Sequence, residues 1–386
     1  MNKNSGRVCG KYANPLAIVP FPGYNRKAPF AERNDIMQPN EQSKPKKNAA
    51  RPLGRLGAFL LVTLALLLIT LLGVIWVLEK GPSPTVTEKF CRSMRETSAI
   101  RWIPNIFLSQ EEVDAFKSES TENDETETVN TSLIHIAPAS SGTGTAEDNG
   151  VELVAITRGT AKGKLLIVRD PSRIILGVSS EEFDAKVPGL QLTELVEKYG
   201  GVAGTNAGGF NDENGRGNGG VPQGLVISGG ALLHTAREDE LYNVVGFDAD
   251  HILHVGTMTA DEALAQGLTD AVSFRTHDGL ASALIINGEV QSKNLGGGVN
   301  PRTAIGQCDD GSVLLLVLDG RSINTLGATM QDVADIMLEY GAVNAGNLDG
   351  GSSSVMVYGG EIINNCASVT GPRNIPTAFI VLPEGA

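Results

Sequence analysis

Two arginines and two aspartates stand beside glycines in short segments of the C-terminal third of this chain: Arg302, Asp319, Arg321 and Asp349. The apolar run Val313–Leu318 ends directly before Asp319, and a run of that length bounded by turn residues predicts a buried strand. Loops at strand ends commonly hold functional groups on a rigid scaffold. These four side chains therefore indicate a site for an anionic, hydroxyl-rich ligand.

The segment after Asp349 is suited to close contact with a ligand. Gly350 and Gly351 allow close backbone approach or positive φ, and Ser352 and Ser353 add hydroxyl groups. An Asp-Gly turn whose carboxylate caps its own loop is the alternative interpretation. Arginine is well suited to binding phosphate, because its planar guanidinium group binds two phosphate oxygens and stays charged at any working pH.

Asn206 and Thr303 are two further polar candidates. The amide of Asn206, in a glycine-rich segment, could bond sugar hydroxyls, and Thr303 follows Arg302 directly. The glycines at 215–220 neither follow a strand nor open a helix, which excludes a dinucleotide-binding motif. A structural ion pair between Arg302 and Asp319 or Asp349 is left open.

From about Val151 to the C-terminus the chain resembles the phosphodiester glycosidase family. The segments that carry the resemblance are Asn206–Phe210, Pro222–Ile227, Ile286–Glu289, Asn300–Gly306, Leu318–Arg321, Asn347–Ser354 and Gly371–Arg373. Each is weak alone, but their number and order are specific.

The resemblance implies a hydrolase that cleaves a sugar-1-phosphodiester, with an oxocarbenium-like transition state at the anomeric carbon. Asp349 is then the expected nucleophile or base, and Asp319 either a second catalytic carboxylate or an orienting group. The expected substrate-binding residues are Arg302, Arg321, Arg373, Asn206, Thr303, Gly350, Gly351, Ser352 and Ser353. A non-catalytic module that binds envelope glycan through the same pocket is the alternative function, and P–O cleavage is a third.

No cofactor is required by this chemistry. Asp319 and Asp349 with nearby carbonyls would suit Ca²⁺ or Mg²⁺, although their spacing does not demand a metal. No CxxC or HExxH motif is present, which argues against a zinc site. His277 is a weaker general-base candidate, since a lone histidine is more often an ordinary core or surface residue.

Residues 57–78 contain no charged side chain and are long enough for a transmembrane helix, with Trp76 near one end. The stretch is too long and too far from the N-terminus for a typical signal peptide. Residues 1–56 hold eleven Lys or Arg against three acids, which predicts a cytoplasmic tail and an extracytoplasmic domain. The expected location is the cell membrane, with the bilayer contacted through residues 57–78 and a cell-envelope glycan as substrate class.

The chain as a whole is acidic, with 44 Asp or Glu against 31 Lys or Arg, and the excess lies beyond the apolar stretch. A nucleic-acid partner is therefore not expected. Residues 79–150 are expected to be a juxtamembrane segment with a helix over 87–100, then an acidic, solvated linker from Gln110. Whether Cys308 pairs with Cys366 is left open.

Short strands between glycine-rich turns dominate residues 151–386, and two helices are predicted at 193–199 and 329–340. Thr329 with Asp332 is the expected N-cap pair of the second helix, and Gly341 its expected stop. Strands and helices do not alternate regularly. We therefore expect an α+β fold, with mixed β-sheets and packed helices in one domain.

Overall fold

The computed structural model describes residues 51–97, 100–116, 128–136, 150–212, 217–237, 240–274, 282–291, 295, 297–320, 325–368 and 371–386. The chain divides into two compact units, Met1–Thr63 and Leu64–Ala386. The predicted cytoplasmic tail before Arg51, and His277 and Arg321, lie outside the described residues.

Helix α1, Arg51–Lys80, contains a stretch long and apolar enough to cross a membrane, Leu56–Lys80. It covers the predicted span 57–78. After it come α2 (Pro84–Arg95), the 3₁₀ turn η1 (Ile103–Asn105) and α3 (Gln110–Asp114). The helix predicted over 87–100 is thus shorter at its C-terminal end and begins earlier, with Pro84 in the first turn, where its missing N–H costs no helical hydrogen bond.

Part of the predicted acidic linker is structured. Ser109 and Glu112 form a capping box that begins α3 at Gln110. Further along, the amide N–H of Asn130 donates to Oδ1 of Asn287 at 2.7 Å, and η2 (Thr131–Leu133) follows. The linker prediction is therefore wrong for these described segments, because local caps and contacts with the sheet region order them.

Three antiparallel sheets form the body of the second unit, and they confirm the α+β class. The first sheet has seven strands in the order β1 (Val151–Arg158), β2 (Ala161–Val168), β13 (Val313–Leu318), β12 (Arg302–Cys308), β14 (Ala342–Asn347), β10 (Ala283–Ile286) and β11 (Glu289–Val290). The second has the order β16 (Glu361–Ile362), β15 (Met356–Tyr358), β4 (Ala203–Asn206), β17 (Thr377–Val381) and β3 (Ile174–Val178). The third has the order β6 (Ala231–His234), β5 (Val226–Ser228), β9 (Leu268–Ser273), β7 (Tyr242–Asp248) and β8 (Leu253–Met258). All the described strand pairings are antiparallel.

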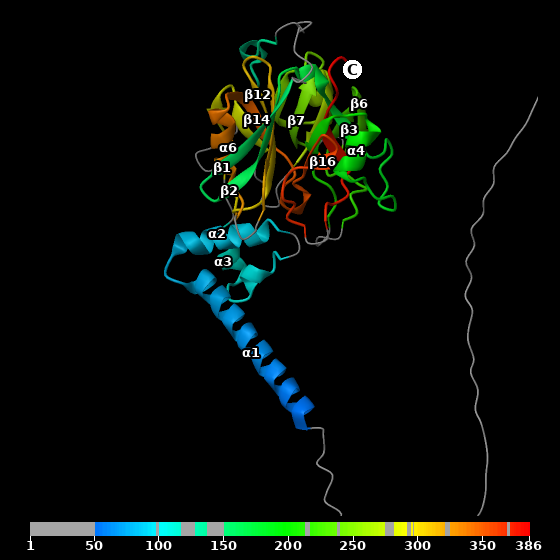
Figure 1. Cartoon of the computed structure of the whole chain (residues 1–386). Helices are drawn as coiled ribbons and strands as arrows, with labels where there is room; N and C mark the ends of the chain where they lie inside the picture. The colour runs from blue at the N-terminus through cyan, green and yellow to red at the C-terminus, as the bar shows by residue number, and fades with distance from the viewer. Residues whose placement is uncertain are drawn as a thin grey trace, which may run out of the picture. The chain divides into compact units, whose positions relative to one another are not determined.

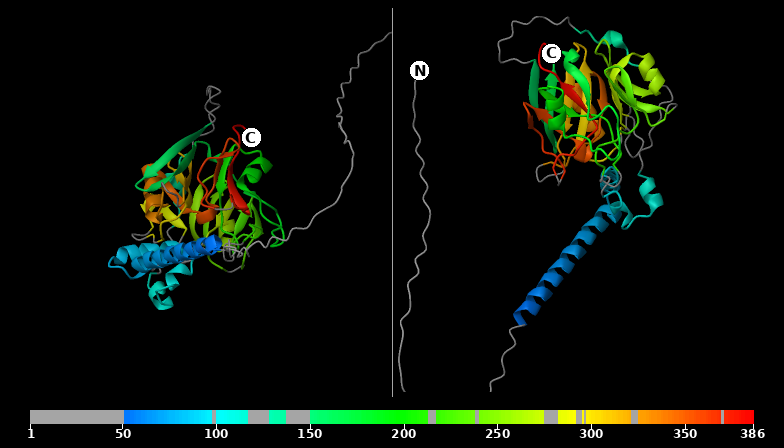
Figure 2. Two further views of the ribbon diagram at one scale, coloured as in Figure 1. Left: turned by 60° about the horizontal axis from the view of Figure 1, so that its bottom comes forward. Right: turned by 90° about the vertical axis from the view of Figure 1, so that its right-hand side faces the viewer.

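One apolar cluster contains buried residues from all three sheets, including Leu315, Phe379 and Val245, and so joins them into one core. The opposite face of each sheet packs on a helix: α6 (Met330–Glu339), α4 (Leu192–Lys198) and α5 (Ala260–Ala265) respectively. Figure 1 shows α6 and α4 on opposite sides of the strands. Figure 2 shows the final strand β17, in red, beside the green strands of the second sheet.

The two helices predicted within the domain are confirmed. Helix α6 begins after Thr329, whose side chain and Asp332 form the expected capping box, and Gly341 follows with φ +86°. Helix α4 covers the other predicted segment. These caps fix the ends of the helices that support the first and second sheets.

Candidate active site

The predicted site residues gather where strands of the first two sheets end. In the first sheet Arg302 pairs in register with Leu318, and Ala304 with Asn347. Asp319 and Asp349 therefore follow the C-terminal ends of β13 and β14, at the same end of the sheet at which β12 begins with Arg302. Asn206 ends β4 of the second sheet, opposite Ala378 of β17.

Backbone contacts hold the loop that carries Asp349. The amide of Asp349 donates to the carbonyl of Ala207 at 3.0 Å, and its own carbonyl accepts from Nδ2 of Asn206 at 2.6 Å. The amide of Gly351 donates to the carbonyl of Pro301 at 3.0 Å. Gly351 has φ +64°, so the glycine is needed at this turn. The carboxyl group of Asp349 thus projects from a loop with a fixed backbone.

Burial raises the pKa of the Asp349 carboxyl to about 7. The hydrogen bond from the Ser353 side chain and the positive charge of Arg373 act in the opposite direction, while the negative charge of Asp212 adds to the increase. A carboxyl group with a pKa near neutral exists in both protonation states at working pH, which is the property required of a general acid or base.

Arg373 and Asp212 form a bidentate ion pair beside this carboxyl. Nη1 and Nη2 of Arg373 lie 2.6 and 2.8 Å from the two oxygens of Asp212. Nη2 also donates to the carbonyl of Gly217 at 2.9 Å, and the guanidinium lies 4.7 Å from the ring centroid of Phe210. A longer contact of 3.4 Å joins Nη1 to the hydroxyl of Ser352. The guanidinium is therefore oriented by Asp212, and its positive charge acts on the Asp349 carboxyl.

Asp212 was not among the residues predicted from sequence. It lies two positions after the glycine-rich Asn206–Phe210 segment, and the antiparallel bridge between Phe210 and Pro222 brings that segment back toward the next motif. The sequence signal that could have identified Asp212 is its position, as an acidic residue directly after a glycine-rich loop.

Arg302 takes the structural role that the sequence left open, but with a different partner. Its Nη2 donates to Oε2 of Glu96, at 2.7 Å, and to the carbonyl of Gly298, at 2.6 Å. Nε donates to the carbonyl of Ala328 at 3.2 Å. The expected partners, Asp319 and Asp349, do not contact it in these described segments. The structure thus places the guanidinium against α2 and the loop before β12.

Asp319, Asn206 and Thr303 are engaged in internal hydrogen bonds. Both oxygens of Asp319 accept from Asn365, one from its amide N–H and one from its side chain. Oδ1 of Asn206 accepts from the hydroxyl of Thr303 at 2.9 Å, and both side chains are buried. These three groups connect the loops. The Asn206 side chain is buried and its Nδ2 donates to the Asp349 carbonyl, while its contact with a sugar stays a prediction.

Among the described residues, no group of three or more His, Cys, Asp or Glu side chains is placed to hold a metal ion. Cys91, Cys308 and Cys366 are free thiols, so the pairing left open for Cys308 and Cys366 is not formed in this structure.

Residues 199–382 match the sequence profile of the phosphodiester glycosidase family. Over 85 residues the chain is 38% identical to the uncharacterized protein YomE from the SPbeta prophage of Bacillus subtilis, a match that spans 22% of this chain and 13% of that protein.

Among solved structures, the chain is similar to the catalytic domain of zebrafish N-acetylglucosamine-1-phosphodiester alpha-N-acetylglucosaminidase, auto-inhibited by its pro-peptide. That likeness has a TM-score of 0.48 at 19% identity and covers 67% of this chain and 87% of that one. A hypothetical protein from Synechocystis has a TM-score of 0.42 at 16% identity, over 60% of this chain and 61% of its own. Residues 199–382, which include most of the motif segments, thus match the phosphodiester glycosidase family.

Proposed function

We propose that this domain hydrolyses a sugar-1-phosphodiester at the anomeric C–O bond, with Asp349 as the catalytic carboxyl group. The single observation that carries the proposal is the Asp349 carboxyl, with its pKa raised to about 7, beside the Arg373–Asp212 pair. The family match supports the reaction class.

The leaving group of such a reaction is a phosphate monoester, which is already a stable anion and needs little help from a strong general acid. The enzyme must instead hold the phosphate and stabilise positive charge at the anomeric carbon. Arg373 is the cation that faces Asp349, and its Nε–H has no acceptor among the described residues. We assign phosphate contact to this donor together with the hydroxyl of Ser352, since the Ser353 hydroxyl donates to Asp349.

Asp349 in its ionised form then acts as nucleophile or as the base that activates water. Asp212 holds the guanidinium of Arg373 in a fixed plane through two short hydrogen bonds. This orientation reduces the reorganisation needed when phosphate binds. Asp319 and Thr303 support the loops and do not enter this step.

The proposal includes a membrane anchor, Leu56–Lys80, with the N-terminus in the cytoplasm and a cell-envelope glycan as substrate. An epitope at the N-terminus should be digested by protease in inside-out vesicles and protected in right-side-out vesicles. The reverse pattern would reject the proposed orientation.

A panel of sugar-1-phosphodiesters tests the reaction, with release of free reducing sugar as the readout. The wild-type chain in detergent should release sugar, and Asp349→Asn should be slower by about 10²–10⁴-fold, the usual contribution of a positioned acid or base. Asp310→Asn, which alters an exposed carboxylate elsewhere, is the control. Equal rates in wild type and Asp349→Asn would reject the assignment, and glycan binding without turnover in the wild type would favour a binding module.

A further inference from the structure

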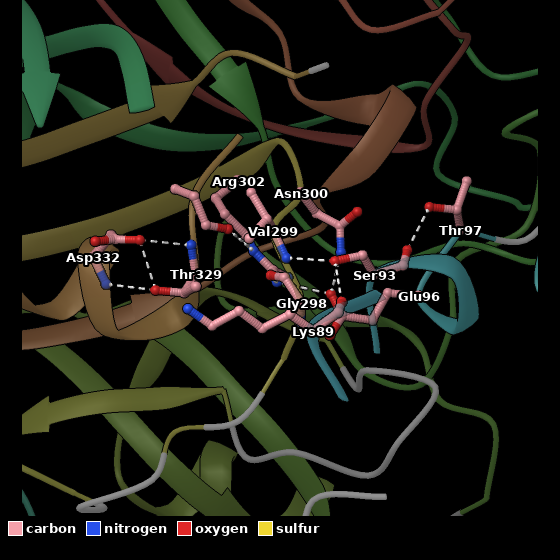
Figure 3. A network of polar contacts seen from close by, with 11 residues as sticks. Lys89, Ser93, Glu96, Thr97, Gly298, Val299, Asn300, Arg302, Thr329 and Asp332 are labelled. Atoms are coloured by element: carbon pink, nitrogen blue, oxygen red, sulfur yellow. Dashed lines mark hydrogen bonds and ion pairs between the residues drawn. The ribbon is translucent and has the colours of Figure 1, made fainter. Parts of the chain in front are cut away.

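Glu96, just past the C-terminal end of α2, is bonded to three groups of a segment that lies some 200 positions later. Its Oε1 accepts from the amide of Gly298 at 2.7 Å. Its Oε2 accepts from Nδ2 of Asn300 at 2.5 Å and from Nη2 of Arg302 at 2.7 Å. Figure 3 shows these contacts converging on the one carboxylate.

The helix and this segment are packed closely as well as paired by charge. The Arg302 and Glu96 side chains are only 6% and 7% exposed. Ser93, one turn earlier, accepts from the amide of Val299 at 2.8 Å. A Cβ on Gly298 would lie 2.3 Å from the backbone nitrogen of Ser93, so only glycine fits against the helix. Residues 297–302 therefore pack closely against α2.

The same segment is also hydrogen-bonded to the loop that carries Asp349. The carbonyl of Pro301 accepts from the amide of Gly351, and the carbonyl of Thr303 accepts from the amide of Leu348 at 2.8 Å. A Cβ on Gly350 would lie 2.9 Å from the Pro301 carbonyl oxygen. A continuous set of hydrogen bonds thus connects Glu96, through residues 298–303, with both sides of Asp349.

We propose that Glu96 is a positioning residue for the Asp349 site and that it acts through residues 297–303. The inference rests on the proposed function for its catalytic readout. It means that the site is completed by a residue outside the family match at 199–382. A domain cut at the start of that match, or at β1, would lack this support.

Glu96→Gln is the main test variant, in the full chain. Glutamine has the same shape but no charge and only one acceptor oxygen, so either Gly298 or the Asn300 and Arg302 side chains lose their acceptor. Glu88→Gln is the matched control, because Glu88 lies on the same helix and pairs with Arg92 at the surface. We expect Glu96→Gln to lower kcat by up to about 100-fold, the cost of misplacing a catalytic group by about 1 Å, with little change in KM. Glu88→Gln should match the wild type.

Two further readouts separate positioning from general damage. The pH–rate limb assigned to Asp349 should move to lower pH in Glu96→Gln, since a looser loop is less buried. The loss of kcat in the double variant Glu96→Ala/Arg302→Ala should be smaller than the product of the two single losses, because the two residues share a contact. A wild-type or raised kcat in Glu96→Gln, or additive losses in the double variant, would overturn the inference.

Amide hydrogen exchange tests the inference without activity. In Glu96→Gln the amides of Leu348 and Gly351 should exchange faster, while that of Val245 in the third sheet stays unchanged. Unchanged exchange at Leu348 and Gly351 would overturn the inference even if the enzyme is active. If the wild type cleaves no sugar phosphodiester, the proposed function fails, and the exchange result still decides whether Glu96 positions the loop.

Discussion

Two arginine–carboxylate pairs lie at the ends of the segments that predicted a site, and they differ in surroundings. The Arg302–Glu96 pair is 6% and 7% exposed, and both carboxylate oxygens accept from further protein groups. The Arg373–Asp212 pair is 13% and 18% exposed and lies beside Asp349. The first pair is enclosed by protein, whereas the second retains surface that a ligand can reach.

The comparison shows that residue type alone does not identify a ligand-binding arginine. Both arginines lie within the matched residues 199–382, and of the two it is Arg373 whose charge lowers the pKa of Asp349. Arg302 donates from Nε and Nη2 to three protein groups and is almost fully enclosed. Arg373 is oriented by Asp212 and acts on a carboxyl group with a raised pKa, and the proposed function rests on that arrangement.

The largest expected effect is on stability, at the enclosed pair. Arg302→Ala should lower the free energy of unfolding by about 3–5 kcal/mol, because it leaves the buried Glu96 carboxylate without its cation. Replacing both residues by methionine should recover only part of the loss, since no charge is then buried but Gly298 and Asn300 lose their acceptor. Denaturant unfolding measures both variants. A loss below about 1 kcal/mol for Arg302→Ala would show that the pair is not enclosed in solution.

The next effect is on turnover, at the accessible pair. Arg373→Ala should lower kcat by about 10²–10³-fold, comparable with the loss of one donor to a developing anion. Arg373→Lys should recover little, because lysine lacks the planar fork that meets Asp212 and phosphate together. Steady-state kinetics with a sugar-1-phosphodiester provides the measurement. Full activity in Arg373→Lys would show that charge alone is sufficient.

Asp349 should make stability depend on pH in a third, smaller effect. Its folded-state pKa, about 7, lies above the ordinary value of 3.8, so the folded protein binds the proton more tightly between these values. The stabilisation is fully present below pH 4 and is lost as pH rises through 7. The difference between 3.8 and 7 corresponds to about 4 kcal/mol in full, and because Asp349 is only partly buried we expect on the order of 2 kcal/mol. Asp349→Asn should remove this contribution and be the more stable protein above pH 7. Equal pH profiles for the two proteins would contradict the raised pKa.

The smallest effect is expected at a third arginine, Arg158, which pairs with Asp335 and Glu339 while 40% exposed. Arg158→Ala should change the free energy of unfolding by no more than about 1 kcal/mol, since exposed ion pairs contribute little. Thermal unfolding in low and high salt measures it. A larger loss of unfolding free energy would mean that solvent exposure does not determine how much each arginine pair contributes to stability.

Local patterns predicted much of the scaffold. The strand Val313–Leu318 forms as β13, because an apolar run between turn residues has few other solutions. Helix α6 follows its Thr329 cap and its Gly341 stop. The glycine-rich loop after Asp349 also has the tight backbone that the sequence indicated.

The pairing of side chains could not be predicted in the same way. Glu96 and Arg302 are separated by 206 positions, and no periodicity connects them. Asp212 meets Arg373 across 161 positions for the same reason. Such contacts follow from how three sheets and α2 pack, which local sequence does not encode.

Hydrolysis in ¹⁸O-labelled water tests the central claim most directly, with the wild-type chain and Asp349→Asn acting on the same sugar-1-phosphodiester. C–O cleavage at the Asp349 site predicts label in the released sugar, at a rate that falls by about 10²–10⁴-fold in Asp349→Asn. Label in the released phosphate, or equal rates for the two proteins, would contradict the account.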